Sequence, residues 1–119
     1  MLATIVHRGP DGEGFWHEGP VGLGHRRLTI LDTSDLASQP MLTGDGTGVL
    51  VYNGETYNFR QLRRELEAEG FRFRSSGDTE VVLRALHHWG PEICIPKLDG
   101  MFALAYLDRR NDTLWLARD

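Results

Sequence analysis

Residues 49–60, VLVYNGETYNFR, carry a strand-like run, a turn dipeptide and the start of a helix pattern. The first four of these residues are apolar, which is typical of a buried strand. Asn53-Gly54 after a strand ordinarily indicates a tight hairpin, because both residue types tolerate a positive φ. Here no second strand-like run follows. The sequence therefore predicts a strand over 48–53 that ends at Asn53 and leaves the polar groups of Asn53 and Gly54 unused by a turn.

Two amphipathic helices are expected next. Asn58 and Gln61 fit a helix N-cap and its capping partner, and apolar residues then recur at spacings of three and four. Gly70 is well placed just past the end of this first helix. Asp78 fits the N-cap of a second helix, and Gly90, followed by a proline, ends it.

The rest of the chain alternates strand-like runs with turn residues. A polar stretch over 32–47, rich in Ser, Thr, Asp, Pro and Gly, is predicted to be a long loop. The last two runs are separated by RRND and predict a β-hairpin. Because hairpins imply antiparallel sheets and two helices lie between the strands, the predicted fold class is α+β. The predicted strands outside 48–53 are 14–17, 21–31, 71–75, 101–108 and 113–119.

The composition is that of one globular domain over residues 1–119. The chain has 40% hydrophobic and 25% charged residues and a formal net charge of −4. This acidic balance argues against a nucleic-acid partner, which would require a basic surface. The longest apolar run, 101–107, is too short to span a bilayer, so no membrane partner is expected.

Cysteine and histidine usage excludes further kinds of site. The single cysteine, Cys94, rules out an internal disulfide and fits a reducing, cytoplasmic compartment. It lies between apolar residues and is interpreted as a small buried side chain rather than a nucleophile. No metal site is expected, because the histidines lack metal-ligand spacing. They stand at positions 7, 17, 25, 87 and 88.

Arg26 and Arg27 lie inside the apolar segment GHRRLTILD (24–32). Successive strand residues point to opposite faces, so one of the two arginines points toward the interior. A buried guanidinium needs a partner, and its planar fork suits a carboxylate held through two parallel bonds. That carboxylate could belong to an internal Asp or Glu, or to a ligand.

Three further candidates lie at the end of the 48–53 strand and the start of the second helix. The side-chain amide of Asn53 and the backbone N–H of Gly54 could converge as an oxyanion hole for charge that develops on an attacked carbonyl. Glu55 and Asp78 could each accept bonds from a ligand ammonium. The alternative is a satisfied turn with Glu55 in solvent and Asp78 acting only as a helix cap.

Seven segments carry a resemblance when they are taken together and in order. They are HRGPDGEG (7–14), GHRRLTILD (24–32), QPM (39–41), VYNGETYNF (51–59), GDTEV (77–81), LDGMFALAYLD (98–108) and LARD (116–119). The chain resembles the class II glutamine amidotransferase domain over essentially its whole length. GPDG and GETYN favour the glutaminase half of glutamine-hydrolysing asparagine synthetases over the branches linked to phosphoribosyl or glucosamine-phosphate synthesis.

The resemblance implies an N-terminal-nucleophile fold, in which two antiparallel sheets pack face to face with helices outside. It implies that an N-terminal cysteine attacks the side-chain amide of glutamine, forms a thioester and releases ammonia, and that water then releases glutamate. The ammonia would pass to a separate synthetase domain that uses ATP and Mg²⁺ to amidate aspartate. No cofactor is then expected within residues 1–119. The full-length enzyme could form a homodimer.

The same resemblance assigns roles to the candidate residues. Arg27 would hold the α-carboxylate of glutamine. Glu55 and Asp78 would hold its α-ammonium. Asn53 and Gly54 would form the oxyanion hole.

The sequence departs from the family at its ends. The family pattern begins Met-Cys-Gly, whereas this chain begins Met1-Leu2-Ala3, and the family continues beyond LARD. We therefore expect residues 1–119 to be a piece of the domain that lacks the nucleophile strand, the last strands and the synthetase domain, and to be inactive alone. The alternatives are a non-catalytic glutamine-binding module, a scaffold with the same shell, or an amidotransferase whose ammonia acceptor is another carboxylate.

Overall fold

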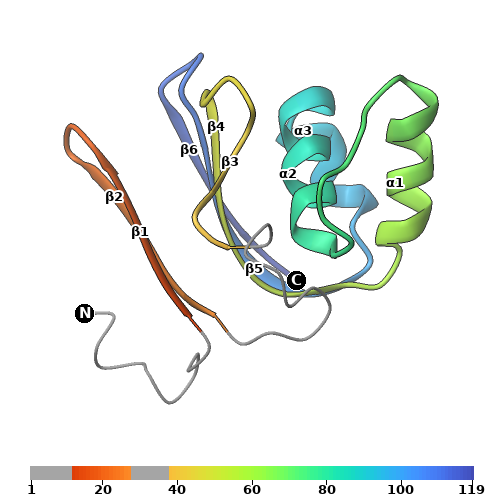
Figure 1. The fold of residues 1–119 in the computed structure, drawn as a ribbon, viewed down its shortest axis with the longest axis horizontal. Coiled ribbons are helices and arrows are strands. Elements are labelled where there is room, and N and C mark those ends of the chain that lie inside the picture. The colour runs from red at the N-terminus through yellow and green to blue at the C-terminus, as the bar shows by residue number, and fades with distance from the viewer. Residues whose placement is uncertain (1–11, 28–37) are drawn as a thin grey trace.

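The computed structural model describes residues 12–27 and 38–119, which form two antiparallel sheets and a group of helices (Figure 1). The smaller sheet is a hairpin of β1 and β2, and the larger sheet has the order β3-β4-β5-β6. The strands are β1 (Gly12–Glu18), β2 (Val21–Arg27), β3 (Met41–Leu42), β4 (Gly48–Thr56), β5 (Gly100–Asp108) and β6 (Thr113–Arg118). The helices are α1 (Phe59–Ala68), α2 (Asp78–Trp89), α3 (Pro91–Cys94) and the 3₁₀ helix η3 (Ile95–Lys97).

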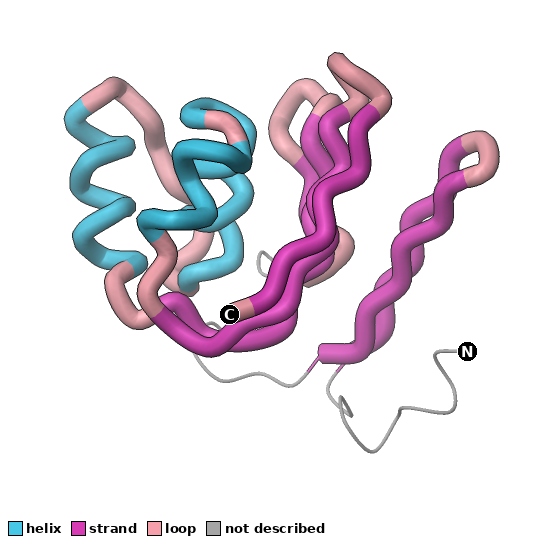
Figure 2. The backbone as a smooth tube through the Cα atoms, turned by 180° about the vertical axis from the view of Figure 1, so that it is seen from behind, coloured by secondary structure: helices cyan, strands magenta, loops and turns pink. Residues whose placement is uncertain are grey.

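The described residues form three layers. The β1–β2 hairpin lies on one face of the larger sheet, and the helices cover the opposite face (Figure 1). The same order of layers is seen from behind, with the helices and the hairpin on opposite sides of the larger sheet (Figure 2). This arrangement confirms the predicted α+β class with antiparallel sheets.

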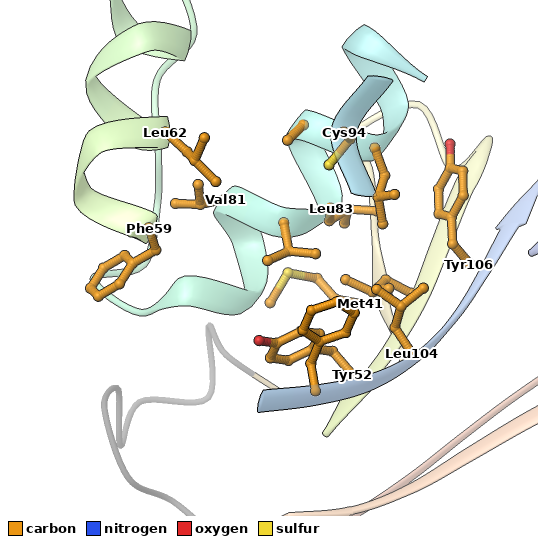
Figure 3. Close-up of a cluster of buried hydrophobic side chains, with 14 of the residues drawn as sticks. Met41, Tyr52, Phe59, Leu62, Val81, Leu83, Cys94, Leu104 and Tyr106 are labelled. Carbon is orange, nitrogen blue, oxygen red and sulfur yellow. The ribbon is translucent and has the colours of Figure 1, made fainter. Parts of the chain in front are cut away.

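The main core lies between the larger sheet and the helices. Alternate residues of β4 point to opposite faces, so Leu50 and Tyr52 both enter this cluster. Leu62 of α1 and Tyr106 of β5 are buried in it as well (Figure 3). Each fully buried leucine of this kind contributes about 1.5–3 kcal/mol to stability relative to an exposed one. This core fixes α1 and α2 against β4 and so fixes the region where the candidate residues lie.

A smaller cluster joins the hairpin to the other face of the sheet. Leu23 of β2 packs with Val49 and Leu107, with Trp16 at its margin. At the tip of the hairpin, Nη2 of Arg109 donates to Oε1 of Glu18 at 2.7 Å. The hairpin is therefore held on the larger sheet by apolar packing and by an ion pair at its end.

The first helix begins and ends close to the predicted residues. Asn58 is its N-cap, but no side-chain capping bond forms. The side-chain amide of Asn58 instead donates to the carbonyl of Lys97 and accepts the N–H of Asp99. These bonds join the start of α1 to the segment that precedes β5. Gly70 follows the helix with φ +99°, and the Phe71 N–H returns to the Leu66 carbonyl as in a glycine-terminated helix end.

The predicted strand over 71–75 is wrong. Phe71 and Phe73 pack against the main core without forming a strand. The backbone N–H groups of Arg74 and Ser75 both donate to the carboxylate of Glu80. Because a buried side chain of α2 satisfies this backbone, the segment forms a bridge between α1 and α2 rather than a strand.

Two other boundaries differ from the predictions. β4 does not end at residue 53; it continues through Thr56, because Gly100 at the start of β5 pairs opposite it. The predicted loop 32–47 contains the two-residue strand β3, while its first residues, like the 28–31 part of the predicted 21–31 strand, lie outside the described residues. The candidate oxyanion donors therefore lie within a paired strand.

Candidate functional site

Asn53, Gly54 and Glu55 are successive residues of β4, each opposite a residue of β5. Asn53 and Gly54 are exposed, and Glu55 is half-buried. The structure thus brings three of the five candidate residues to one stretch of strand. Their backbone groups can bind a ligand only where pairing with β5 does not already use them.

The edge of β4 that faces away from β5 is covered in different ways along its length. β3 pairs only with residues 49–50. Beyond that point side chains replace the neighbouring strand. The Tyr52 N–H donates to Oε1 of Gln39 at 2.5 Å, and the Thr56 N–H donates to Oδ2 of Asp78 at 2.9 Å.

Gly54 lies midway between these two anchored residues. Alternate residues of an antiparallel strand direct their N–H groups to the same edge, so the Gly54 N–H lies on the edge that Tyr52 and Thr56 use. The opposite residue agrees with this geometry. The N–H of Phe102 donates to Oδ1 of Asp119, and the carbonyl of Phe102 accepts the N–H of Asp119, so both groups face away from β4. The backbone donor predicted for the oxyanion hole therefore faces away from β5, at the margin of the sheet.

Close approach of the two strands explains why position 54 is a glycine. Gly54 has φ +144°, a conformation that residues with a side chain rarely adopt. A Cβ there would overlap the carbonyl oxygen of Met101 and lie 2.6 Å from the Cα of Phe102. Gly100 lies on β5, two residues before Phe102, and a Cβ there would overlap the carbonyl oxygen of Glu55. Glycine on both strands lets β4 and β5 stay paired through the site.

Arg27 ends β2, and its side chain lies outside the described part of the structure. Its position along the sheet can still be inferred from the backbone. Leu23 packs with Val49, and Nε2 of His25 bonds the carbonyl of Tyr52 at 3.1 Å, so β2 and β4 run in the same direction. The end of β2 therefore lies toward the stretch of β4 that carries the candidate oxyanion donors.

Asp78 is buried at the start of α2, with a relative exposure of 6%. The N-cap of this helix is Gly77, so the predicted capping position is off by one residue. Burial raises the pKa of Asp78, backbone N–H groups of Thr56 and Thr79 oppose that rise, and the nearby charge of Glu55 adds to it. Two carboxyl groups from separate elements thus lie close enough to interact. Such a pair is suited to a shared cation, because a positive charge between them relieves their repulsion.

Several contributors to this site carried no predicted role in the sequence. The hydroxyl groups of Tyr52 and Thr56 are 2.6 Å apart, and burial raises the pKa of Tyr52. Gln39 and His25 bond the backbone of Tyr52 from two other segments. Gln39 and His25 lie 13 and 27 residues from Tyr52 in the sequence, so no local pattern predicts these bonds. Only their presence in the segments QPM and GHRRLTILD pointed to them.

The residues described provide neither a reactive thiol nor a metal centre at this site. Cys94 is fully buried in α3, and burial raises the pKa of its thiol to about 12, so it stays protonated at neutral pH. Within 12–27 and 38–119 there is no group of three His, Cys, Asp or Glu side chains that could hold a metal ion. Among the helices of the same residues, none is long and apolar enough to cross a membrane.

Comparison with solved structures supports the fold. The chain is similar to the glutamine phosphoribosylpyrophosphate amidotransferase from Bacillus subtilis, solved with ADP and GMP, with a TM-score of 0.67 and 27% identity. That match covers 82% of this chain and 23% of the solved chain. A structure described as the allosteric regulatory enzyme of purine biosynthesis matches with a TM-score of 0.64 and 25% identity. The α+β fold is therefore that of N-terminal-nucleophile amidotransferases.

Sequence comparison identifies the family. Asparagine synthetase [glutamine-hydrolyzing] 1 of Bacillus subtilis is 44% identical over 119 residues, covering 100% of this chain and 18% of the relative. The Sandersonia aurantiaca asparagine synthetase is 41% identical, covering 100% of this chain and 22% of the relative. The chain thus spans about a fifth of the length of these relatives. The family model for the glutamine amidotransferase domain matches residues 1–119, and the chain belongs to this family, as a class II domain related to glutamine-hydrolysing asparagine synthetases.

Proposed function

We propose that this domain hydrolyses the side-chain amide of glutamine to glutamate and ammonia, within a protein that resembles the asparagine synthetases. The observation that carries the proposal is the edge of β4 that faces away from β5. There the N–H of Gly54 lies beside the exposed Asn53, between two backbone groups that side chains already hold. Two donors on a fixed strand suit an oxyanion, because they need no reorganisation when charge develops on the attacked amide.

Recognition of the substrate as a free amino acid would use charges on both sides of this edge. Glu55 and Asp78 would share the α-ammonium of glutamine, and their mutual repulsion favours a cation between them. Arg27 at the end of β2 would hold the α-carboxylate through its planar fork. With both ends of the amino acid fixed, the side-chain amide would lie at the oxyanion donors.

The reaction also needs a cysteine nucleophile with a free thiol. Cys94 does not suit that role, because it is fully buried and its pKa is about 12. We therefore propose that residues 1–119 supply the binding and oxyanion groups, and that the thiol belongs to another part of the protein. A polypeptide of these 119 residues should release no glutamate from glutamine.

The similarity to asparagine synthetases supports a proposal for the fate of the ammonia. We propose that it amidates aspartate in a synthetase domain that uses ATP and Mg²⁺. An acceptor carboxylate other than aspartate is the second candidate. Assays of the full-length protein with ATP, Mg²⁺ and glutamine, supplied with aspartate or with other carboxylates in turn, distinguish the two by the amide that forms.

The proposed glutaminase activity is tested on the full-length protein by following glutamate release. Glu55→Gln should raise the KM for glutamine about ten- to a hundredfold, because a bond to a charged group is worth about 1.5–3 kcal/mol. Glu67→Gln changes an exposed carboxylate of α1 and is the matched control. Full-length protein that releases no glutamate, or equal KM values for the two variants, would contradict the proposal.

A further inference from the structure

We propose that His25 and Gln39 are positioning residues, which hold the backbone of Tyr52 so that the next residues of β4 present the oxyanion donors. This inference rests on the glutamine hydrolysis proposed above. Neither side chain is placed in contact with the substrate. Both act through the strand.

The two side chains satisfy both backbone polar groups of one strand residue. Oε1 of Gln39 accepts the N–H of Tyr52 at 2.5 Å, and Nε2 of His25 bonds the carbonyl of Tyr52 at 3.1 Å. They come from separate segments, since His25 lies in β2 and Gln39 lies just before β3. Buried backbone groups need hydrogen-bond partners, and at a sheet edge no neighbouring strand supplies them. Here two side chains take the place of that strand.

This substitution of side chains for a strand has a consequence for Gly54. A strand paired at Tyr52 would continue along the edge and take the Gly54 N–H, which lies on the same side. The side chains of Gln39 and His25, in contrast, bond this edge at the backbone groups of Tyr52. Within residues 12–27 and 38–119, no side chain is bonded to the N–H of Gly54, two residues further on, and we assign this donor to a ligand.

The same contacts orient the donors. The carbonyl of Tyr52 and the N–H of Asn53 belong to one planar peptide, so a bond to that carbonyl fixes the plane from which Asn53 projects. The Tyr52 side chain is also held, because its hydroxyl bonds that of Thr56 at 2.6 Å. Three side-chain contacts thus fix the residue that precedes the oxyanion pair.

His25 further links the two halves of the proposed substrate site. It stands two residues before Arg27 on β2, so its bond to Tyr52 sets the register of that strand along β4. Gly14 on β1 allows the hairpin to approach Gln39 closely, since a Cβ there would overlap the carbonyl oxygen of Gln39. The distance between the carboxylate-binding and oxyanion-binding groups is therefore set partly by His25.

The test is steady-state glutaminase kinetics of the full-length protein. His25→Leu and Gln39→Leu should each lower kcat about ten- to a hundredfold, the scale of a small misplacement of reacting groups. His25→Gln retains an N–H donor and Gln39→Glu retains an acceptor, so these variants should recover most of the lost rate. His17→Leu on β1 and Gln61→Leu on α1 change exposed side chains and should retain wild-type rates.

A double-mutant cycle separates positioning from general support of the fold. In an Asn53→Ala background, His25→Leu should lower kcat much less than in the wild type, because the group it positions is already gone. Should His25→Leu fail to fold, His25→Asn, whose amide is too short to reach Tyr52, takes its place in the cycle.

Four outcomes would overturn the inference: unchanged kcat in the Leu variants, a rise in KM alone, no recovery in the conservative variants, or fully additive effects with Asn53→Ala. Failure of the underlying function is distinguishable from these. In that case the wild-type protein itself would release no glutamate.

Discussion

The Oδ2 atom of Asp78 accepts the backbone N–H of Thr56 at 2.9 Å, so the first residue of α2 is bonded directly to the last residue of β4. Both residues are buried. This contact places a carboxyl group beside Glu55, one residue away on the strand, and fixes the helix against the candidate site. Asp78 thus has a structural role and, in the proposed function, a binding role.

The negative charge of Asp78 should reduce the stability of the domain, although in the proposed function the same charge binds the ammonium of glutamine. Burial raises its folded-state pKa above the unfolded value, near 3.9. A raised pKa means that the carboxyl's favourable contribution is fully present below the unfolded pKa and is lost as pH rises through the folded pKa. Asp78→Asn should therefore have a melting temperature at least as high as that of the wild type at pH 7. Near pH 3.5, where Asp78 is mostly protonated in both states, the variant should lose any gain in melting temperature over the wild type. Its KM for glutamine should rise at least about tenfold.

Asp78→Ala is the informative comparison. It removes the acceptor of a buried N–H, which costs about 1–3 kcal/mol. It should unfold at a lower temperature than Asp78→Asn. If the two variants were equally stable, the bond between Asp78 and Thr56 would not have the structural role assigned to it.

Gly54→Ala should destabilise the domain and abolish glutamine hydrolysis together. The φ of +144° disfavours any side chain, and backbone strain of this kind costs about 1–3 kcal/mol before the overlap with Met101 is added. Denaturant unfolding and glutaminase assays measure both effects. Gly44→Ala, at a position with no atom within 4 Å of the added Cβ, should change stability by less than about 0.5 kcal/mol. Equal stabilities of the two variants would contradict the close approach of β4 and β5.

His87 should make the stability of the domain depend on pH. Its Nδ1 lies 2.7 Å from the Tyr106 hydroxyl, and its Nε2 lies 3.0 Å from that of Thr47. Burial and then the charge of Arg110 lower the pKa of His87, against opposing effects of Asp45 and Asp108. The unfolded chain therefore binds the proton more readily. Stability should fall as pH drops from about 6.5 toward the lower folded-state pKa.

Substitution of His87 tests that dependence. His87→Gln cannot titrate, so its melting temperature should fall less between pH 7.5 and pH 5.5 than that of the wild type. The assignment fails if His87→Gln retains the full wild-type dependence.

Local patterns predicted the two longer helices, α1 and α2, and most strands, but not α3 or η3. The reason is visible in their residues. Phe59, Leu62 and Leu66 recur at helical spacing and are all buried, and Gly70 ends that helix as expected. The strand expected over 71–75 failed because alternation of apolar and basic residues does not reveal that Glu80 captures the backbone there. Sequence periodicity reports burial, and a strand also requires a backbone partner.

The functional roles of the candidate residues stay predictions, and their observed geometry differs from what the sequence indicated. Asn53-Gly54 suggested a strand end, whereas β4 continues to Thr56, because the partner that extends it begins 44 residues later at Gly100. The roles of Gln39 and Asp78 as edge acceptors depend equally on distant contacts. The side-chain placement of Arg27 lies outside the described residues, and its role stays a prediction.

The most direct test of the central claim is the kinetics of Asn53→Ala in the full-length protein. Asn53 is exposed, so the variant should fold normally. If Asn53 and Gly54 form the oxyanion hole, kcat for glutamine hydrolysis should fall about a hundred- to a thousandfold with little change in KM. A rise in KM with kcat unchanged would show that Asn53 binds the ground state only, and would contradict the account.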